Sequence, residues 1–207
     1  MKEIITFKNR LIINSDDKSV TKFFGSKKEF EKELFIYKLH PAFAPRLLSY
    51  NANKMSISTR LIEGNTLINF QDFDFKEIAK LFYKLHTIAD ETICLIDTNP
   101  KNFLYSPKED RYFIIDFSDW EYRGKEFDLI HFLLFWASLW KFEKFAKTTQ
   151  TFLNEYNKLN SIDKSLWKDE VNNVILFFDK RREKYNKKEK KVNSDTENNR
   201  NMLRRLF

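Results

Sequence analysis

Oxygen-bearing side chains interrupt an otherwise apolar segment in the middle of the chain, LIDTNPKNFLYSPKEDRYFIIDFSDW, residues 95–120. Asp97, Asn102 and Asp116 supply two carboxylates and one amide to this segment. Hard oxygen donors of this kind suit Mg²⁺, which usually keeps water and substrate phosphate in its remaining coordination positions. The three side chains therefore predict a small metal site beside a phosphate-bearing substrate.

A predicted β-hairpin brings two of these side chains together. SPKED is a turn signal between two strand-like runs, NFLY and RYFIID. Folding the runs antiparallel about Glu109 pairs Asn102 with Asp116 at the open end of the hairpin. Asp97 lies on a loop that contains Pro100 and can return to the same place. In the alternative interpretation, Asp97 and Asn102 are ordinary turn residues and Asp116 caps the end of a strand.

The segments before this hairpin predict a small β-rich region with one helix. The helix is expected at Ser26–His40, because Ser26 can serve as an N-cap, apolar residues recur at helical spacing and Pro41 ends the pattern. Two strand candidates, LLSY and KMSISTRLI, follow the helix. Earlier β-rich runs are Ile4–Phe7, Leu11–Asn14 and Ser19–Phe24.

From Phe75 onward the pattern is mainly helical. One amphipathic stretch extends from there to Ala89, and three more helices are predicted after the hairpin, at Glu126–Trp140, Lys141–Leu159 and Ser165–Glu183. A chain of 207 residues is long enough for two small lobes that share a cleft. The predicted fold class is therefore α+β, with a β-rich N-terminal lobe (1–64), a helical C-terminal lobe (65–184) and a basic, flexible tail (185–207).

The spacing D-x-x-x-x-N, followed by a strand, a turn and I-I-D-F, resembles the catalytic loop and metal motif of the two-lobed protein-kinase-like fold. The similarity is closer to its small-molecule branch, the aminoglycoside and choline kinases and the kinases of lipopolysaccharide core sugars. In that branch the loop reads like HGDLHPGN and the later motif reads IDF or IDW. The resemblance implies that Asp97 is the catalytic base, and that Asn102 and Asp116 hold Mg²⁺ against the phosphates of ATP.

The same resemblance implies a nucleotide site in the β-rich lobe. Lys22, on the third predicted strand, would contact the α- and β-phosphates, and Val20 on the same strand face would pack on the adenine. Glu33 matches the helix glutamate that pairs with this lysine in the family. Glu29 and Glu31 lie close enough to be alternatives.

Two further segments match the family pattern. TRLIEG resembles the hinge between the lobes, where backbone groups of Arg60, Leu61 and Ile62 would bind adenine. GKEFDLIHFLLF resembles a segment of the aminoglycoside-kinase branch, in which Asp128 would brace the catalytic loop rather than react.

Two features depart from that pattern. The chain has only three glycines and none lies in the first hairpin, so the usual G-x-G-x-x-G cover of the phosphates is absent. Lys8, Asn9 and Arg10 occupy the predicted turn and offer charge in its place. Leu95 and Ile96 stand where the family keeps His-Gly. Because the predicted base and metal residues remain, we favour an active enzyme.

The net charge of +7 is concentrated at the C-terminal end. From Lys180 onward, 11 basic and 4 acidic residues account for all of it, so residues 1–179 are formally neutral. We therefore expect no nucleic-acid partner for the body of the protein. Residues Lys180–Lys191 are either a solvated helix end or a contact for an anionic membrane surface or a phosphorylated acceptor.

Other features bear on the compartment. No apolar run approaches the ~20 residues of a membrane span, and the opening MKEIITFKNR lacks a signal-peptide core. The single cysteine, Cys94, excludes an internal disulfide and is expected to be a small buried hydrophobe. We expect a cytoplasmic protein, with contact at the inner membrane face through the basic tail as an alternative, and the oligomeric state stays open.

The leading hypothesis is a phosphotransferase that moves the γ-phosphate of ATP to a hydroxyl group of a small molecule or sugar, with a lipopolysaccharide-core sugar as the preferred acceptor. A protein serine/threonine kinase is the alternative enzyme, but no APE-like segment follows the metal motif. Two non-enzymatic alternatives are a nucleotide-binding pseudokinase and a basic-tailed nucleic-acid binder.

Overall fold

The structure of the chain, a computed structural model, describes residues 2–5, 9–69, 73–185 and 193–207. It consists of two compact units. Unit 1 comprises Met1–Phe73 and Lys101–Trp120, and unit 2 comprises Asp74–Pro100 and Glu121–Phe207. This division differs from the predicted boundary after residue 64, because the hairpin around Glu109 packs with the N-terminal unit.

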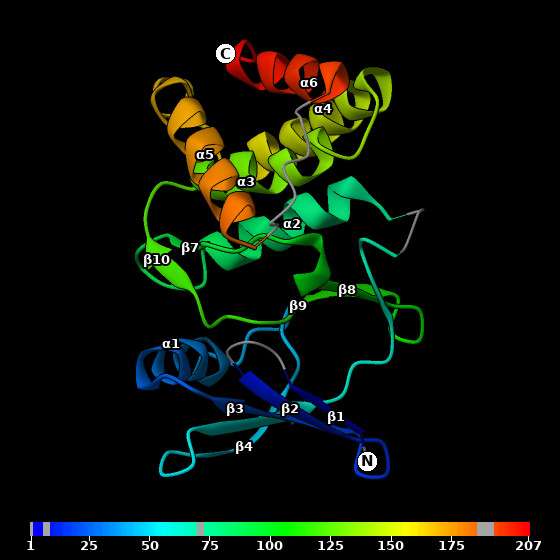
Figure 1. The fold of residues 1–207 in the computed structure, drawn as a ribbon, viewed down its shortest axis with the longest axis vertical. Coiled ribbons are helices and arrows are strands. Elements are labelled where there is room, and N and C mark those ends of the chain that lie inside the picture. The colour runs from blue at the N-terminus through cyan, green and yellow to red at the C-terminus, as the bar shows by residue number, and fades with distance from the viewer. Residues whose placement is uncertain (1, 6–8, 70–72, 186–192) are drawn as a thin grey trace. The chain divides into compact units, whose positions relative to one another are not determined.

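Unit 1 is built on a five-stranded antiparallel sheet with the strand order β1-β2-β3-β5-β4 (Figure 1). The strands are β1 (Lys2–Ile5), β2 (Asn9–Asn14), β3 (Ser19–Phe24), β4 (Leu47–Asn51) and β5 (Ser56–Arg60). Each forms close to its predicted run. Phe7 of the first predicted run lies outside the described residues.

Helix α1 (Lys27–Lys38) packs against this sheet. Phe30, Leu34 and Tyr37 recur at helical spacing and are buried, and the ring of Phe30 meets that of Phe24 on β3 at 5.8 Å. Ser26 occupies the N-cap position as predicted, but its side chain makes no capping hydrogen bond. The helix therefore depends on its buried apolar face rather than on a side-chain cap.

A second, three-stranded sheet in unit 1 contains the predicted hairpin, β8 (Phe103–Ser106) and β9 (Arg111–Ile114), with β6 (Asn65–Thr66) beside β8. Its register pairs Phe103 with Ile114, so the predicted pairing of Asn102 with Asp116 is wrong by one residue. Asn102 lies instead beside Ile115, whose amide donates to the Asn102 carbonyl at 2.8 Å. The reason is a turn of four residues, 107–110, which has no central residue about which the strands could be symmetric.

Unit 2 is mainly helical. Its aromatic core joins three helices, with the ring of Phe82 at 5.1 Å from Phe132 and 5.7 Å from Phe152. A short two-stranded sheet, β7 with β10, lies in the same region. The elements are α2 (Phe75–His86), β7 (Ile93–Leu95), β10 (Trp120–Tyr122), α3 (Glu126–Ala137), α4 (Phe142–Leu159) and α5 (Lys164–Tyr185).

The C-terminal end of the chain differs from the predicted flexible tail. Residues 194–204 form helix α6 (Ser194–Arg204), begun by Asn193, whose side chain accepts a hydrogen bond from the Thr196 amide. Leu203 is fully buried, and the Asn199 amide donates to the carbonyls of Ala137 and Trp140. Polar composition hid this helix, because polar side chains such as Asn199 and Arg200 make much of its buried contact, in place of an apolar stripe. Residues 186–192 of the predicted tail lie outside the described residues.

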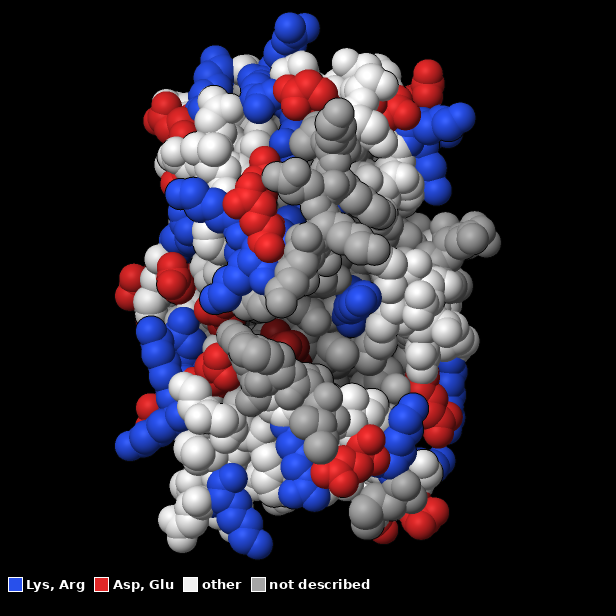
Figure 2. Space-filling view, in the orientation of Figure 1, with Lys and Arg blue, Asp and Glu red and all other residues white. Residues whose placement is uncertain are grey.

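Among the described residues, no helix combines the length and apolar character that a bilayer span requires. On the face drawn in Figure 2, Lys and Arg side chains are interspersed with Asp and Glu side chains. The described part of this face therefore presents mixed charge rather than a field of one sign.

Candidate functional site

In unit 1, three charged side chains from distant parts of the sequence form one cluster, named here the Lys22 cluster. The ammonium of Lys22 lies 2.6 Å from Oε2 of Glu33 and 2.7 Å from Oδ1 of Asp116. The helix partner of the lysine is thus Glu33, rather than Glu29 or Glu31. Two carboxylates share a single cation.

Local structure explains why these side chains meet. Lys22 lies in the middle of the sheet, opposite Leu11 on β2 and Ile57 on β5, and its ammonium lies 4.8 Å from the Phe24 ring centre. Glu33 lies on the buried face of α1 and is 3% exposed. A charge so deeply buried is stable only when it is paired, and here Lys22 supplies the pair.

The balance between burial and ion pairing differs among these three groups, so their pKa values shift differently. Burial alone would lower the pKa of Lys22, but the two carboxylates outweigh it and the pKa is raised, so the lysine stays charged. Burial raises the pKa of Glu33 to about 7, against the opposing effect of Lys22. Burial also opposes ionisation of Asp116, but Lys22 and the hydrogen bonds from Ser118 prevail and hold the pKa of Asp116 below its usual range.

Asp116 has the geometry of a ligand for a hard cation. It follows the end of β9 with φ at 70°, a left-handed conformation that Asp adopts more readily than most residues. Ser118 Oγ donates to its Oδ1 at 2.6 Å, and the side chain remains 42% exposed. Asn102 lies at the same end of the hairpin, where its backbone carbonyl accepts from the Ile115 amide. An ionised, accessible carboxylate is a suitable ligand for a hard cation such as Mg²⁺.

Hydrogen bonds within unit 1 already occupy two of the backbone groups that were predicted to contact adenine at the hinge. The Arg60 amide donates to the Arg46 carbonyl at 2.9 Å, and the Leu61 amide donates to the Lys18 carbonyl at 2.7 Å. These two amides therefore have protein partners. Val20 is half-buried on β3, opposite Thr59 of β5.

The predicted charge substitute for the glycine-rich loop is only partly described. Asn9 and Arg10 do not lie in a turn, because both belong to β2, opposite Phe24 and Phe23. The Arg10 guanidinium is paired with Glu3 on β1. Both residues are thus part of the sheet, and Lys8 lies outside the described residues.

In unit 2, Asp97 lies on the loop that follows β7, residues 96–100, named here the Asp97 loop. The Asn99 amide donates to its Oδ1 at 3.2 Å, and the guanidinium of Arg181 on α5 lies 3.4 Å from its Oδ2. The Asp97 side chain is 40% exposed. A half-exposed carboxylate with one oxygen held by the backbone can accept a proton from a bound hydroxyl group.

Buried side chains brace the start of this loop. Oδ2 of Asp128 accepts from the Leu95 amide at 2.7 Å and lies 3.2 Å from Nε2 of His86. The other ring nitrogen of His86 lies 2.7 Å from the Tyr156 hydroxyl. The sequence predicted the bracing position of Asp128. It did not predict that His86 would join it.

A second brace lies one residue beyond Asp97. The hydroxyl of Thr98 lies 2.7 Å from Nδ1 of His131 on α3, and both residues are buried. Burial lowers the pKa of His131 to about 3, with a smaller contribution from the positive charge of Arg181. The imidazole is therefore neutral at physiological pH and serves as a hydrogen-bonding support.

His86, Cys94 and Asp128 also place their potential ligand atoms within 4.8 Å of one another. Metal binding requires a thiolate, but burial raises the pKa of Cys94 far above its ordinary value. The thiol donates to the carbonyls of Arg123 and Gly124, and the histidine and aspartate bond to each other. These three residues therefore form a hydrogen-bonded support. Cys94 is buried, as the sequence predicted.

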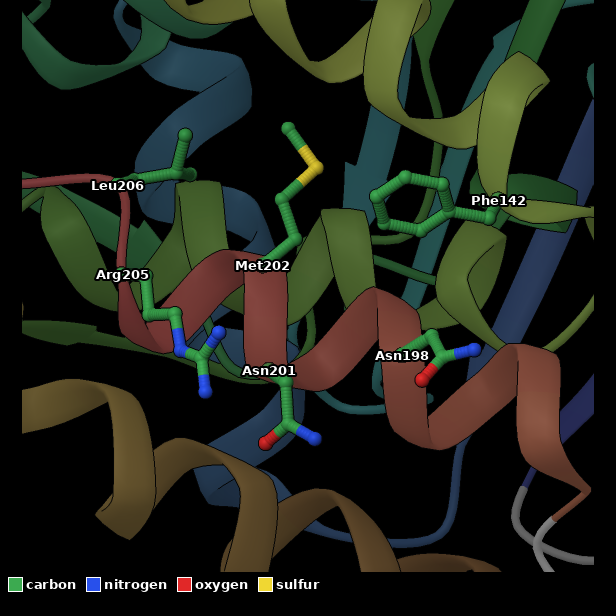
Figure 3. Close-up of a pocket in the computed structure, with 6 residues that line it drawn as sticks. All are labelled: Phe142, Asn198, Asn201, Met202, Arg205 and Leu206. Carbon is green, nitrogen blue, oxygen red and sulfur yellow. The ribbon is translucent and has the colours of Figure 1, made fainter.

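Two pockets lie away from these groups, one in each unit. In unit 2, a pocket of about 500 Å³ lies beside α6. Figure 3 shows Met202 of α6 and Phe142 of α4 pointing toward the same space. In unit 1, a pocket of about 200 Å³ is lined by Arg46, Arg60 and Arg111 among others. Neither pocket is lined by Lys22, Asp97 or Asp116.

No protein-family model matches the chain, and no curated protein sequence matches it. Solved structures do match. The choline kinase LicA from Streptococcus pneumoniae superposes over 97% of this chain and 89% of its own, with a TM-score of 0.57 and 16% identity. An aminoglycoside phosphotransferase from Alicyclobacillus acidocaldarius covers 100% of this chain and 90% of its own, with a TM-score of 0.62 and 11% identity.

The fold is that of the protein-kinase-like small-molecule kinases. A choline/ethanolamine kinase family protein from Mesorhizobium loti agrees, with a TM-score of 0.62 and 12% identity over 98% of this chain and 92% of its own. This kinase-like fold confirms the predicted class of an N-terminal β-rich region with a helical remainder. At these identities the likeness establishes the fold alone.

The main residue that sequence reasoning missed is Arg181. It stood in a run of basic residues, KRREK, that was interpreted as a solvated helix end or a charged contact. The only signal available was helical spacing, because Arg181 follows Phe177 by one turn and lies over its ring at 5.5 Å. Nothing in the sequence links it to Asp97, which lies far earlier in the chain.

Proposed function

We propose that this protein transfers the γ-phosphate of ATP to a hydroxyl group of a small molecule. The observation that carries the proposal is the Lys22 cluster, in which a buried lysine stays charged between a helix glutamate and an exposed hairpin aspartate. A purely structural ion pair requires one carboxylate. The second carboxylate, accessible and held in a left-handed backbone conformation, is explained by a bound cation and phosphate.

Each half of the proposed site has its own task. Lys22 binds the inner phosphates of ATP, and Glu33 holds the lysine in place. Asn102 and Asp116 hold Mg²⁺, which when bound neutralises charge on the phosphates. Ile62 and the hinge carbonyls contact the adenine, with Val20 packed on its face. The solved structure of LicA with AMP, which has a TM-score of 0.58 and 16% identity, supports nucleotide binding by this fold.

Asp97 supplies the chemistry of the acceptor. The acceptor hydroxyl donates to Oδ2 of Asp97, its oxygen attacks the γ-phosphorus, and ADP leaves as the bond to the β-phosphate oxygen breaks. The hydroxyl proton passes to Asp97. Asn102 follows Asp97 by five positions, so the chain itself limits the Cα–Cα distance between the proposed base and metal ligand to about 18 Å.

A saccharide hydroxyl is the preferred acceptor in this proposal, with a lipopolysaccharide-core sugar as the specific candidate. The support is chemical, because such sugars carry phosphates and α5 ends in basic residues. The same residues offer a contact for an anionic membrane surface. The matching solved structures are kinases named for choline, ethanolamine or aminoglycosides, so the proposed acceptor class rests on this chain's own residues.

The proposal is tested by Mg²⁺-dependent ATP turnover with a panel of alcohols and sugars. The natural protein is compared with Asp97→Asn and with the control Asp90→Asn, which changes an exposed aspartate of the same unit. Loss of the base is expected to lower turnover by about 10²- to 10⁴-fold, while the control keeps the natural rate. Equal background rates in all three proteins, with Mg²⁺–ATP still bound, would identify a pseudokinase.

A further inference from the structure

The pocket of unit 1, with a volume of about 200 Å³, has three arginines in its lining. Its wall is formed chiefly by residues 40–47, by the end of β5 and by the start of β9, which carry Arg46, Arg60 and Arg111 respectively. No aspartate or glutamate is among the described residues of this lining. Guanidinium groups repel one another, so three of them around one small pocket require negative charge nearby.

One carboxylate, that of Glu109, supplies part of this negative charge. Its Oε1 lies 2.7 Å from Nη1 of Arg60, and its Oε2 lies 2.9 Å from Nη2 of Arg111. The hydrogen bond from Arg60, together with the one from Arg111 and the charge of both, lowers the pKa of Glu109, so this carboxyl is ionised. The three arginines and Glu109 carry a formal charge of 3 − 1 = +2. The arrangement is the inverse of the Lys22 cluster, in which two carboxylates share one cation.

The guanidinium groups keep N–H donors for a ligand, because each has five. Arg60 directs Nη1 and Nη2 at Glu109, and Arg111 adds only a 3.5 Å hydrogen bond to the Ala42 carbonyl to its bond with Glu109. Arg46 is exposed, and its side chain has no hydrogen-bond or ion-pair partner among the described residues. The side chains of Arg60 and Arg111 are 34% and 46% exposed, so an ion from solvent can reach them.

Backbone pairing and aromatic packing hold this positive charge in place. The Arg60 amide donates to the Arg46 carbonyl at 2.9 Å, which fixes the backbones of these two arginines side by side. The guanidinium groups of Arg60 and Arg111 lie 5.9 Å and 4.5 Å from the centre of the same ring, that of Phe113. Planar cations that are already held by a ring and a carboxylate lose little freedom when they bind a ligand.

The size and charge of the pocket indicate its ligand. A volume of about 200 Å³ lies below the ~300–1,000 Å³ of pockets that enclose drug-sized molecules, so a small ion fits better than a nucleotide. Guanidinium groups bind phosphate in a two-bond geometry, and a formal charge of +2 matches a phosphate dianion. We propose that this pocket binds a phosphate group, either the free ion or the phosphate of a small monoester. Lys22 and Asp116 do not line it, so the site is separate from the proposed site of phosphoryl transfer.

The test measures binding of inorganic phosphate to the full-length protein by phosphorus NMR at low ionic strength. Mg²⁺ and a non-hydrolysable ATP analogue are present to fill the proposed nucleotide site. We expect the natural protein to bind phosphate with a Kd of about 1 mM or tighter. Arg46→Gln removes one charge without breaking a described ion pair, and it should weaken binding by about tenfold. Glu109→Gln removes the competing carboxylate, and it should strengthen binding by about threefold or more.

Lys54→Gln is the matched control, because it removes a positive charge from an exposed residue between β4 and β5 of the same unit. It should keep the natural affinity. The proposal is overturned if the natural protein does not bind phosphate, or if Arg46→Gln leaves the binding unchanged. An equal loss in Arg46→Gln and Lys54→Gln would replace the site by general attraction between charges. Unchanged or weaker binding in Glu109→Gln would show that Arg60 and Arg111 do not face the anion, and this result also rejects the proposal.

Glycerol 3-phosphate, tested in the same way, identifies the source of the phosphate group. If it binds more tightly than inorganic phosphate and depends on Arg46, the ligand is a small phosphorylated molecule. If inorganic phosphate binds more tightly, the ligand is the free ion, and both results support the site. Turnover of ATP decides the proposed function separately, because phosphate binding that depends on Arg46 is expected whether or not ATP is turned over.

Discussion

In the Lys22 cluster of unit 1, one ammonium is shared by two carboxylates, whereas in the Asp97 loop of unit 2 one half-exposed carboxylate is held by a backbone amide and faced by a guanidinium. The first arrangement fixes charge, because Lys22 stays protonated whatever the pH of a living cell. The second fixes the position of the carboxylate, because buried hydrogen bonds to Asp128 and His131 hold the loop in place. Binding a polyphosphate requires permanent charge, and accepting a proton requires a well-placed, accessible oxygen.

The largest effect is expected when the Lys22 cluster loses its exposed carboxylate. Asp116→Asn removes the ionised ligand proposed for Mg²⁺, and metal ions supply several kcal/mol of charge stabilisation in such transfers. Turnover should fall by about 10³-fold or more, and Mg²⁺ should no longer strengthen ATP binding. Calorimetric titration of ATP with and without Mg²⁺ measures the second effect.

Asp16→Asn is the control for that experiment, since Asp16 is an exposed acid of the same unit in the β2–β3 turn. It should behave as the natural protein does. If Asp116→Asn still bound ATP with natural, Mg²⁺-dependent strength, the hairpin would not be part of the metal site.

Removal of the shared cation tests the electrostatics of unit 1. Lys22→Met leaves Glu33 buried without its partner, which should cost about 3 kcal/mol of unfolding free energy at pH 8. Because burial already raises the pKa of Glu33 to about 7, this group takes up a proton easily, and the cost should be smaller at pH 5. The sign follows from linkage: the folded variant binds this proton more tightly than the unfolded chain, so stability falls as pH rises through and above the unfolded value.

Chemical denaturation at pH 5 and pH 8 measures this difference. Adding Glu33→Gln to Lys22→Met should recover much of the stability at pH 8. The control Lys28→Met, which changes an exposed lysine on the helix that carries Glu33, should alter the stability little. An equal loss at both pH values would mean that Glu33 is not the group left unpaired.

Loss of a support in unit 2 should affect rate more than binding. His86→Phe removes the partner of Asp128 while filling most of the same space, so the brace on the Leu95 amide loosens. We expect kcat to fall by about tenfold with little change in KM for ATP, because small displacements of a catalytic group are costly. A proportional rise in KM for ATP would instead connect this support to nucleotide binding.

A further prediction concerns the pH dependence of stability and the second support. The folded protein keeps His131 neutral down to about pH 3, while the unfolded chain protonates it near 6.5. Stability should therefore fall as pH drops below 6.5, by about 2 kcal/mol at pH 5 from this group. His131→Asn keeps a hydrogen-bonding nitrogen for Thr98 and should show a flatter profile between pH 5 and pH 7. Identical profiles would assign the acid sensitivity to other groups.

Sequence patterns were most informative where local rules decide the outcome. Strand and helix patterns located the elements that carry Lys22 and Glu33, the resemblance to the kinase-like fold implied that the two pair, and the turn signal SPKED located the hairpin. The register failed by one residue because a four-residue turn and an odd-numbered turn have the same residue types. The contact of Arg181 with Asp97 and the existence of helix α6 could not be predicted. Each lies in a run of similar basic or polar residues, and only tertiary contacts show which residue of the run is paired or buried.

The division of labour between the two regions is tested most directly by measuring Mg²⁺–ATP binding and turnover side by side in Asp97→Asn and Asp116→Asn. Asp97→Asn should bind Mg²⁺–ATP as tightly as the natural protein while its turnover falls by about 10²-fold or more. Asp116→Asn should lose both properties. Natural turnover in Asp97→Asn, or an equal loss of Mg²⁺–ATP binding in the two variants, would contradict the account.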